Sequence, residues 1–506
     1  MKFKMRSMSR NMSASLICRV VALFAGLIVQ HQILVAFGST YNGLTSLIGQ
    51  IMSYLVLLEA GLGAASIQAL YSPLNEDDWT RVNGILNATA SSYTKIGIMF
   101  GVLLLGGSLL VPLVTAGEID FFVAGLLTLV TGAGNIFTYI LGGKNVALLS
   151  ADRKMYVMFS ADTVTTVLSA TFRVIALNSG CGIIAVQSIQ LVCVLLKNIF
   201  LLTYVRCRYS RLDKSVSADF KAISKRWNVL VHSLAGLVVN HTDIIILTIA
   251  SSLKLVSVYN VYNMVYGQMG NVIQSTFMQA PQGEFGRVLY SDKDEFEKLY
   301  AKYEVVFTVL LFAIITLALI LTRPFVSLYT AGITDVEYLD FWLPILFAVI
   351  LLMSQIRGPA TLTINAAGAF KETQRGAIIE AAINLVVSLI LFLATDLGMY
   401  GLLLGTVCSY LFRTVDVIYY VYKHIIKRSI WRFLRLFAIN ALTAIGIWYV
   451  FCVLIPITAN SYIEWIYKAA ISGIISMASF ALMNITLNFN ETKSALAGML
   501  NKKRTT

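Results

Sequence analysis

The chain has 506 residues, of which 58% are hydrophobic and only 13% are charged. Soluble proteins are about half apolar and about a quarter charged, so this composition excludes a soluble globular domain and predicts several membrane spans. The net charge of +13 also occurs in nucleic-acid binders, but the basic residues are scattered over short loops, and we expect no nucleic-acid partner. The six cysteines lack paired spacing, so we expect no metal site, and no cofactor is expected either.

A helix of about 20 apolar residues spans the hydrocarbon core of a membrane. The sequence therefore predicts an all-α polytopic membrane protein with about fourteen transmembrane helices. The predicted spans cover roughly residues 14–37, 43–70, 85–115, 121–149, 155–177, 182–205, 227–252, 255–285, 303–329, 339–366, 375–396, 398–422, 436–456 and 463–487.

A sequence motif of the first half of the chain recurs in the second half. The motif at 25–31, Ala-Gly-Leu-Ile-Val-Gln-His, reappears at 235–241 as Ala-Gly-Leu-Val-Val-Asn-His, 210 positions later. Two further matches follow at an offset of 219: Tyr71-Ser72 with Tyr290-Ser291, and Gly182 with Gly401. We interpret this pattern as a duplication that produces two six-helix bundles. Internal repeats of this kind are typical of transporters, whose binding site lies where the repeats meet.

The repeat and the loops predict six segments. These are a cytoplasmic N-terminus at 1–13, an N-terminal bundle at 14–205, a basic connector at 206–226, a C-terminal bundle at 227–424, two additional helices at 436–487 and a cytoplasmic tail at 488–506. For the connector, anchoring to anionic lipid is a simpler interpretation than a partner site.

Loop charges predict the orientation. On the side that holds both termini, the loops contain 29 of the 39 Lys and Arg residues. The opposite loops contain only Lys254, and the other nine lie within the spans. The positive-inside rule therefore places both termini in the cytoplasm, and the absence of a signal peptide fits a multi-pass protein of the bacterial inner membrane.

The loops are too short for a catalytic domain, so we expect a protein that is not an enzyme. The nearest approach to a phosphate-binding Gly-rich loop is Gly142-Gly143-Lys144-Asn145, which lacks the first Gly and the hydroxyl residue. Transport energy must then come from an ion gradient, from the membrane potential or from the substrate gradient.

Polar side chains follow one face of the first span. Ser15, Arg19, Ala22, Gly26 and Gln30 recur at steps of three or four residues. The seventh span repeats this pattern with His232, Gly236, Asn240 and Asp243. The two faces could line a wet central cavity, or their small residues could serve helix packing while the polar ones bond across helices.

The eighth span is the most polar. Asn260, Asn263, Gly267, Asn271 and Gln274 lie along one side, interleaved with three tyrosines that include Tyr266. Amides bond hydroxyl groups and aromatic rings stack on sugars, so this span could contact a glycan. A glycine-kinked helix with bonds to its neighbours is an equal alternative. A weaker version of the pattern, with Gln50, occurs in the second span.

Other charged residues lie inside the predicted spans, where they normally face a cavity or a partner. Lys144, Arg173 and Arg357 are candidate cavity cations, and Gly358-Pro359 should interrupt the helix after Arg357. Two further sets of polar residues lie in or beside the spans. Arg413 with Asp416 and Glu464 with Lys468 have the spacing of helical ion pairs, while Asp162, Glu380 and Asn384 could couple an ion or link helices.

One motif resembles a known family. The residues Gly368-Ala369-Phe370-Lys371, Glu380, Asn384, Ser388, Gly398, Gly401 and Gly405-Thr406 resemble the second-half signature of bacterial polysaccharide-export flippases. These belong to the multidrug/oligosaccharidyl-lipid/polysaccharide exporter superfamily, and the span pattern agrees over nearly the whole chain. The resemblance implies a MATE-like fold, with two bundles around a cationic cavity, and the flipping of lipid-linked oligosaccharides. In the related lipid II flippases several arginines lie on the first two helices; here only Arg19 does.

The predicted function is an inner-membrane flippase for an undecaprenyl-diphosphate-linked oligosaccharide in surface polysaccharide (O-antigen-type) synthesis. Its partners would be this substrate, the membrane lipids and a coupling H+ or Na+. A cation-coupled multidrug antiporter of the same fold is the alternative, and it would rely on acidic residues instead of cations.

Overall fold

The structure is a computed structural model that describes residues 2–59, 61–115, 117–226, 242–279 and 281–487. Within these ranges the chain is almost entirely helical and contains no β-strand. This confirms the predicted all-α fold. The chain divides into two compact units. Unit 1 comprises Met1–Ser257 and Gly332–Val336, and unit 2 comprises Val258–Ala331 and Glu337–Thr506. The bundle limits at 205 and 227 remain a prediction.

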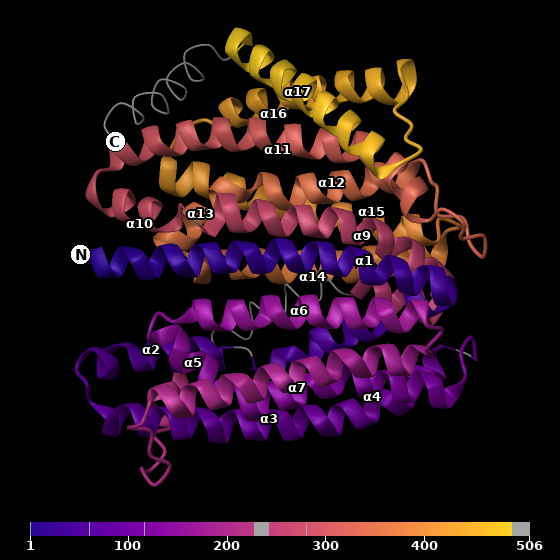
Figure 1. Cartoon of the computed structure of the whole chain (residues 1–506). Coiled ribbons are helices and arrows are strands. Elements are labelled where there is room, and N and C mark those ends of the chain that lie inside the picture. The colour runs from indigo at the N-terminus through magenta and orange to yellow at the C-terminus, as the bar shows by residue number, and fades with distance from the viewer. Residues whose placement is uncertain (1, 60, 116, 227–241, 280, 488–506) are drawn as a thin grey trace. The chain divides into compact units, whose positions relative to one another are not determined.

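In unit 1 long helices run side by side: α3 packs against α4, α4 against α7, α7 against α6, and α6 against α1 (Figure 1). Their bounds are α1 Lys2–Leu55, α2 Leu62–Asn75, α3 Trp79–Val114, α4 Phe121–Phe137, α5 Gly143–Ala151, α6 Met155–Asn178 and α7 Ile183–Arg208, with short η turns at Val56–Glu59, Thr138–Gly142 and Lys221–Arg226. Residues 242–250 are also helical.

The long helix α1 bends at Gly38. This residue has φ 78° and ψ −178°, a left-handed conformation that glycine adopts without a Cβ clash. The bend separates residues 2–37 from residues 39–55, which continue through η1 into α2. The helix α1 therefore contains the first predicted span and the beginning of the second, whose remainder lies in η1 and α2.

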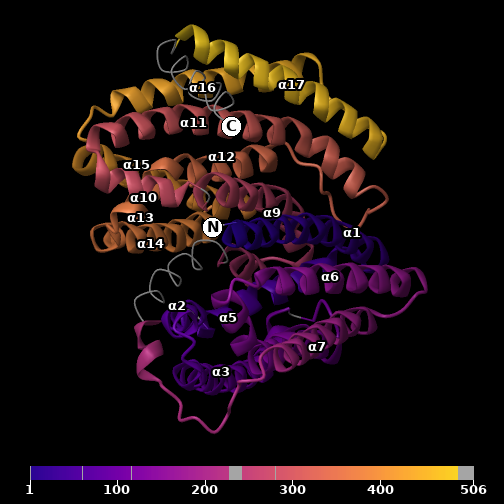
Figure 2. The same cartoon turned by 60° about the vertical axis from the view of Figure 1, so that its left-hand side comes forward.

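Unit 2 is arranged around α11. Both α16 and α17 pack against this helix, α12 lies between α11 and α15, and α14 packs along α15 (Figure 2). The bounds are α9 Leu253–Ile273, α10 Gln282–Ser291, α11 Lys293–Tyr329, α12 Trp342–Ile356, α13 Gly358–Ala367, α14 Phe370–Ala394, α15 Met399–Tyr420, α16 Trp431–Tyr449 and α17 Tyr462–Leu487, with η turns at Gln274–Gln279, Val421–Ile426 and Val450–Leu454. The first residues of α9 belong to unit 1.

Ten helical segments of the described chain are long and apolar enough to cross a membrane. One of them, residues 13–75, contains the first two predicted spans, and α6 and α9 coincide with the fifth and eighth. The seventh predicted span, 227–252, lies mostly outside the described residues. Most helix positions thus agree with the predicted spans, but the second predicted span is divided between α1, η1 and α2, and the eighth extends beyond the end of α9 at Ile273.

Aspartates begin several of these helices. Asp120 accepts from the amides of Phe122 and Val123 at 3.0 and 3.1 Å, and Asp292 caps α11 in the same way. The first amides of a helix have no partner within the helix, so these carboxylates satisfy them and set where each span starts.

Candidate functional site

Four charged side chains of unit 2 form an ionic cluster inside the spans. Glu380 accepts a hydrogen bond from Arg357 at 2.8 Å and lies 3.5 Å from Arg413, which in turn bonds Asp416 at 2.6 Å. The side chains of Glu380 and Arg413 are only 10% and 12% exposed. The Arg357 guanidinium also lies 5.3 Å from the centroid of the Tyr410 ring. The two positive and two negative charges of the ionic cluster balance one another.

The helix is interrupted at Arg357, the residue that joins the ionic cluster from this part of the chain. Helix α12 ends at Ile356 and α13 begins at Gly358, as the Gly-Pro pair predicted. A side chain on Gly358 would collide with Phe307 and Met278, so glycine permits the close packing there. The carbonyl of Met353, near the end of α12, accepts from the Thr414 hydroxyl at 2.6 Å. A protein hydroxyl thus satisfies one carbonyl of the interrupted helix.

Several of the residues that carry the family resemblance lie in the interface of α14 and α15. Asn384 donates to Thr406 at 3.0 Å, and the Ser388 hydroxyl donates to the carbonyl of Leu402 at 3.1 Å. A side chain at Gly405 would collide with Ser388, and one at Gly401 would collide with the backbone of Leu391. Of the two roles considered for Glu380, Asn384 and Asp162, the contacts favour links between helices: Asp162 pairs with Lys197 at 2.9 Å. The predicted pairs Arg413–Asp416 and Glu464–Lys468 both form.

On α9 the structure separates the tyrosines from the amides. Tyr266 is 3% exposed, donates to the carbonyl of Pro344 at 2.9 Å and accepts from Thr322 at 3.2 Å. Its ring also stacks on Phe347, 5.8 Å between centroids. Tyr266 therefore packs the core of unit 2, and the expectation that its ring stacks on a sugar is revised, because an amphipathic tyrosine finds both its apolar and its polar partners inside the protein.

The amides of α9 remain more accessible. Asn260 and Asn263 are partly buried, and Asn271 is exposed, as are Gly267 and Gln274. We call these five positions the α9 amide face. A side chain on Gly267 would approach nothing closer than Asn263, at 4.0 Å, so this glycine does not serve close packing. The face retains amide groups that could bond hydroxyls.

In unit 1 the first half of α1 leaves its polar face open. Arg19, Ala22 and Gly26 are exposed, and a side chain built on Gly26 would meet no atom within 4 Å. No carboxylate forms an ion pair with Arg19 in the part of the chain that the structure describes. Gln30, at the far end of the face, donates to Asn42 at 3.3 Å. The packing alternative for these small residues is thus not observed within unit 1.

The second polar group of unit 1 lies around Tyr54. Its hydroxyl is 2.8 Å from that of Thr242, and the charge of Asp243 acts on it. Asp243 is only 4% exposed, and Gln50 is partly buried one turn before Tyr54. His232 and Asn240, the other candidates of the seventh span, lie outside the described residues.

Two other candidate cations, Lys144 and Arg173, lie on α5 and α6 and not on α1. Arg173 on α6 donates to Gln190 and Gln187 of α7 at 2.9 and 3.1 Å. Lys144 faces a recess of about 340 Å³, where Arg206 and Lys214 also lie. Part of the connector closes this recess, because Asn83 and Asn87 on α3 bond its backbone. Sequence reasoning missed these two asparagines, although asparagine at the start of a span is a recognisable polar signal.

Sequence reasoning also missed a polar group near the bend of α1. Asp335 accepts from the amide and hydroxyl of Ser39 at 2.9 and 2.6 Å, and fully buried Asn42 donates to Ser257 at 2.6 Å. Partial burial would raise the pKa of Asp335, but the bonds from Ser39 and the charge of Lys254 outweigh it and lower that pKa. Only the unusual backbone of Gly38, which the sequence does not reveal, brings Ser39 to this carboxylate.

Comparisons with known proteins bear on the fold. No protein-family model matches the chain, and no curated protein gives a significant sequence match. Among solved structures, the lipid II flippase MurJ in an inward closed conformation matches with a TM-score of 0.66 and 14% identity, over 94% of this chain and 98% of that one. An inward-facing multidrug resistance MATE family transporter of the MOP superfamily matches with a TM-score of 0.61 and 13% identity, over 81% of this chain and 98% of that one. A MOP superfamily transporter from Pyrococcus furiosus matches with a TM-score of 0.51 and 14% identity, over 84% of this chain and 96% of that one. The predicted MATE-like fold is confirmed.

Proposed function

We propose that this protein is an inner-membrane flippase that moves an anionic, lipid-linked oligosaccharide from the cytoplasmic to the outer leaflet. The class of carrier is an undecaprenyl diphosphate, and the product would supply surface polysaccharide synthesis. Transport would proceed by alternating access, without covalent chemistry. The fold it shares with a lipid II flippase and with multidrug transporters supports a transport role; the substrate class is argued from the charges inside the spans.

The observation that carries the proposal is the unequal pairing of these charges. Three carboxylates of the described spans are engaged: Asp162 by Lys197, Glu304 by Tyr422, and Glu380 by two arginines. In contrast, five of the nine Lys and Arg residues in the predicted spans have no carboxylate partner among the described residues. These five are Arg19, Lys95, Lys144, Arg173 and Arg323. Among the described residues of the spans, the charge that lacks an oppositely charged partner is thus mainly positive, which favours an anionic substrate.

Arg19 is the residue that we assign to the diphosphate. A lipid diphosphate cannot leave water for hydrocarbon without a counter-charge, because an unpaired ion there is prohibitively costly. A guanidinium can hold two phosphate oxygens at once, which an ammonium group cannot. Arg19 lies on an open face of α1 whose other members are small or polar. The α9 amide face would bond the glycan hydroxyls.

The multidrug alternative depends on an acidic residue that can exchange protons or cations. Asp243, buried near Tyr54, is the residue that would serve it. The other carboxylates named above are bonded by Lys, Arg or Tyr, and this disfavours the multidrug route. A carboxylate that is paired with a cation resists protonation, because the cation stabilises its charged form.

Purified full-length protein in proteoliposomes distinguishes the two functions. One arm follows the flipping of a fluorescent polyprenyl-diphosphate oligosaccharide, and the other follows the uptake of a cationic dye under an imposed H+ or Na+ gradient. We expect lipid flipping without dye transport. Gradient-driven dye transport without lipid flipping would overturn the proposal in favour of the antiporter.

The proposed orientation is tested separately, in a variant without native cysteines. Single cysteines at Ser179 and Asn460 should react with an impermeant reagent added outside, and one at Ser217 should not. All three positions are exposed in the structure, so access is limited only by the membrane. Reversed labelling at two of them would contradict cytoplasmic termini.

A further inference from the structure

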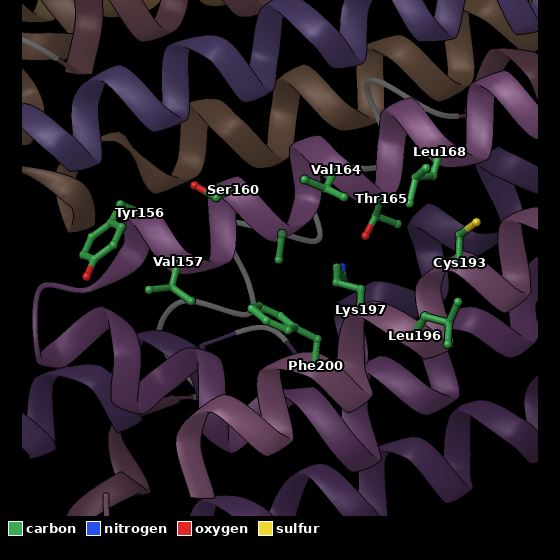
Figure 3. Close-up of a pocket in the computed structure, with 11 residues that line it drawn as sticks. Tyr156, Val157, Ser160, Val164, Thr165, Leu168, Cys193, Leu196, Lys197 and Phe200 are labelled. Carbon is green, nitrogen blue, oxygen red and sulfur yellow. The ribbon is translucent and has the colours of Figure 1, made fainter. Parts of the chain in front are cut away.

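A groove runs between α6 and α7 on the surface of unit 1 (Figure 3). Its volume is about 490 Å³, and we call it the α6–α7 groove. Its walls are mostly apolar, and several wall residues are strongly exposed: Val164 by 58%, Leu196 by 59% and Phe200 by 51%. The lining residues are Tyr156, Val157, Ser160, Ala161, Val164, Thr165 and Leu168 of α6 with Cys193, Leu196, Lys197 and Phe200 of α7. An open groove of this composition suits a hydrocarbon chain.

The one charged residue in the lining does not change this conclusion. Lys197 bonds Asp162 across 2.9 Å, and the two side chains are only 17% and 23% exposed. Because each charge already has its partner, the pair leaves no unpaired ion to repel a hydrocarbon or to attract an anion into the middle of the groove. The chemistry of the groove therefore changes only at its end, near Tyr156.

At that end two aromatic residues and two arginines form a mouth. The guanidinium of Arg10 lies 4.1 Å from the centroid of the Tyr156 ring, and the ring of Tyr204 lies 6.3 Å from that of the groove residue Phe200. Arg208 lies close enough for its charge to act on Tyr204. Neither arginine forms an ion pair with a carboxylate in the described part of the chain. Tyrosines and arginines at the end of a span are typical of the level of lipid head groups.

The length of the groove corresponds to one leaflet. From Tyr156 to Leu168 the helix rises by roughly 18 Å, at 1.5 Å per residue. Half of the hydrocarbon core is about 15 Å thick. A single acyl chain that begins at the mouth would therefore fill the groove and end near the centre of the membrane.

We propose that the α6–α7 groove binds an anionic phospholipid of the leaflet on the N-terminal side, with one acyl chain in the groove and the phosphate between Arg10 and Arg208. This site is distinct from the proposed transport site. Arg10 belongs to α1 and Arg208 to α7, so the phosphate would link these two helices. Asn11 already ties α1 to the start of α6, through the amide of Tyr156 at 2.9 Å and the carbonyl of Arg153 at 3.0 Å. The bound lipid would strengthen this attachment of α1.

The test compares the binding of two phospholipids to the purified full chain, in neutral detergent and without transport substrate. Phosphatidylglycerol and phosphatidylcholine with equal acyl chains are added in turn, and native mass spectrometry and the thermal midpoint report binding. We expect phosphatidylglycerol to be retained and to raise the midpoint, while phosphatidylcholine does neither. Inorganic phosphate should also have no effect, because it lacks the chain. Equal retention of both lipids would overturn the proposed phosphate site.

Variants locate the binding. Arg10→Gln with Arg208→Gln should weaken phosphatidylglycerol binding about thirtyfold, as expected for two basic residues at an anionic head group. Leu196→Trp should fill the α6–α7 groove and abolish retention. Ile199→Trp is the matched control, because Ile199 is 50% exposed on the same helix but does not line the groove. Equal lipid retention by the two tryptophan variants would show that the chain does not occupy the groove. Retention is read without transport, so this result is independent of the flipping assay.

Discussion

Glu380 holds Arg357 at 2.8 Å and Arg413 at 3.5 Å, so one carboxylate links the junction of α12 and α13 to α14 and α15. All three side chains are at least four-fifths buried. A buried charge is costly unless its partners compensate for it, and here both arginines share the same acid, while Arg413 also bonds Asp416 at 2.6 Å. The ionic cluster is therefore a structural element of unit 2 that includes one residue, Arg357, first considered as a cavity cation.

Removal of the shared acid should destabilise unit 2. Glu380→Gln keeps the shape but removes the carboxylate partner of buried Arg357 and leaves Arg413 with Asp416, and breaking a buried ion pair in this way should cost about 3–5 kcal/mol. Thermal unfolding in detergent measures the effect. Glu464→Gln is the control, since its pair with Lys468 is more exposed and should leave the midpoint unchanged. The double variant Arg357→Gln/Glu380→Gln should lose less than the sum of the single losses, and strict additivity would contradict the coupling.

Glycine at 405 should be required for the packing of α14 on α15. Gly405→Ala places a methyl group against Ser388, and overpacking of this kind costs roughly 1–3 kcal/mol. Gly446→Ala on α16 is the matched control, because no atom lies within 4 Å of its added methyl group. The control should be neutral or slightly stabilising, since alanine favours a helix over glycine by up to about 1 kcal/mol. Similar melting of both variants would contradict the proposed contact.

The positions of the spans could be predicted because the membrane imposes a length and a composition on each helix. The break after Arg357 and the pair of Arg413 with Asp416 could also be predicted, because both depend on local sequence. The bend at Gly38 could not, since the same glycine inside an apolar run is compatible with a straight helix. Its effect, the approach of Ser39 to Asp335, joins residues 296 positions apart.

The candidate site was harder to predict than the fold, because spacing reveals a helix face but not what covers it. Tyr266 and Asn263 lie on the same predicted helix, yet one is enclosed by Pro344, Thr322 and Phe347 while the other stays partly accessible. The motif around Glu380 and Ser388 indicated a family, but the structure assigns its residues to packing. A sequence motif can thus indicate a fold through residues that pack one helix against another.

The contact between Asp335 and Ser39 should make part of the stability depend on pH. The folded protein lowers the pKa of Asp335, so its contribution is present above the unfolded value of about 3.9 and is lost as the pH falls through the folded value. Melting curves of wild type and Asp335→Asn between pH 7 and pH 3 measure this. The wild type should be more stable near pH 7, and the difference should shrink below about pH 4. A constant difference over this range would contradict the assignment.

Exchanges on α9 should separate substrate contact from packing. Asn263→Ala and Asn271→Ala should reduce export while protein levels stay near wild type, because a lost bond between membrane helices costs only about 0.6 kcal/mol. Tyr266→Phe should have the opposite profile, because it removes the buried bond to Pro344 but no group from the α9 amide face. Export is measured per molecule of protein in the membrane. Loss of protein in the asparagine variants, with normal export per molecule, would support a packing role instead.

The flipping rate of Arg19→Ala is the most direct measurement of the central claim, that a cation on α1 carries the diphosphate. Proteoliposomes with equal amounts of folded wild type, Arg19→Ala, Arg19→Lys and Lys95→Ala are compared with a polyprenyl-diphosphate oligosaccharide. A charge-assisted bond contributes ~1.5–3 kcal/mol, so Arg19→Ala should lose at least about tenfold in rate. Arg19→Lys should retain part of the rate. Lys95→Ala should flip nearly normally, because it removes a cation that lies over the ring of Phe220 and not the one assigned to the diphosphate. A normal rate for Arg19→Ala would contradict the claim and leave Arg19 as a residue of topology or packing.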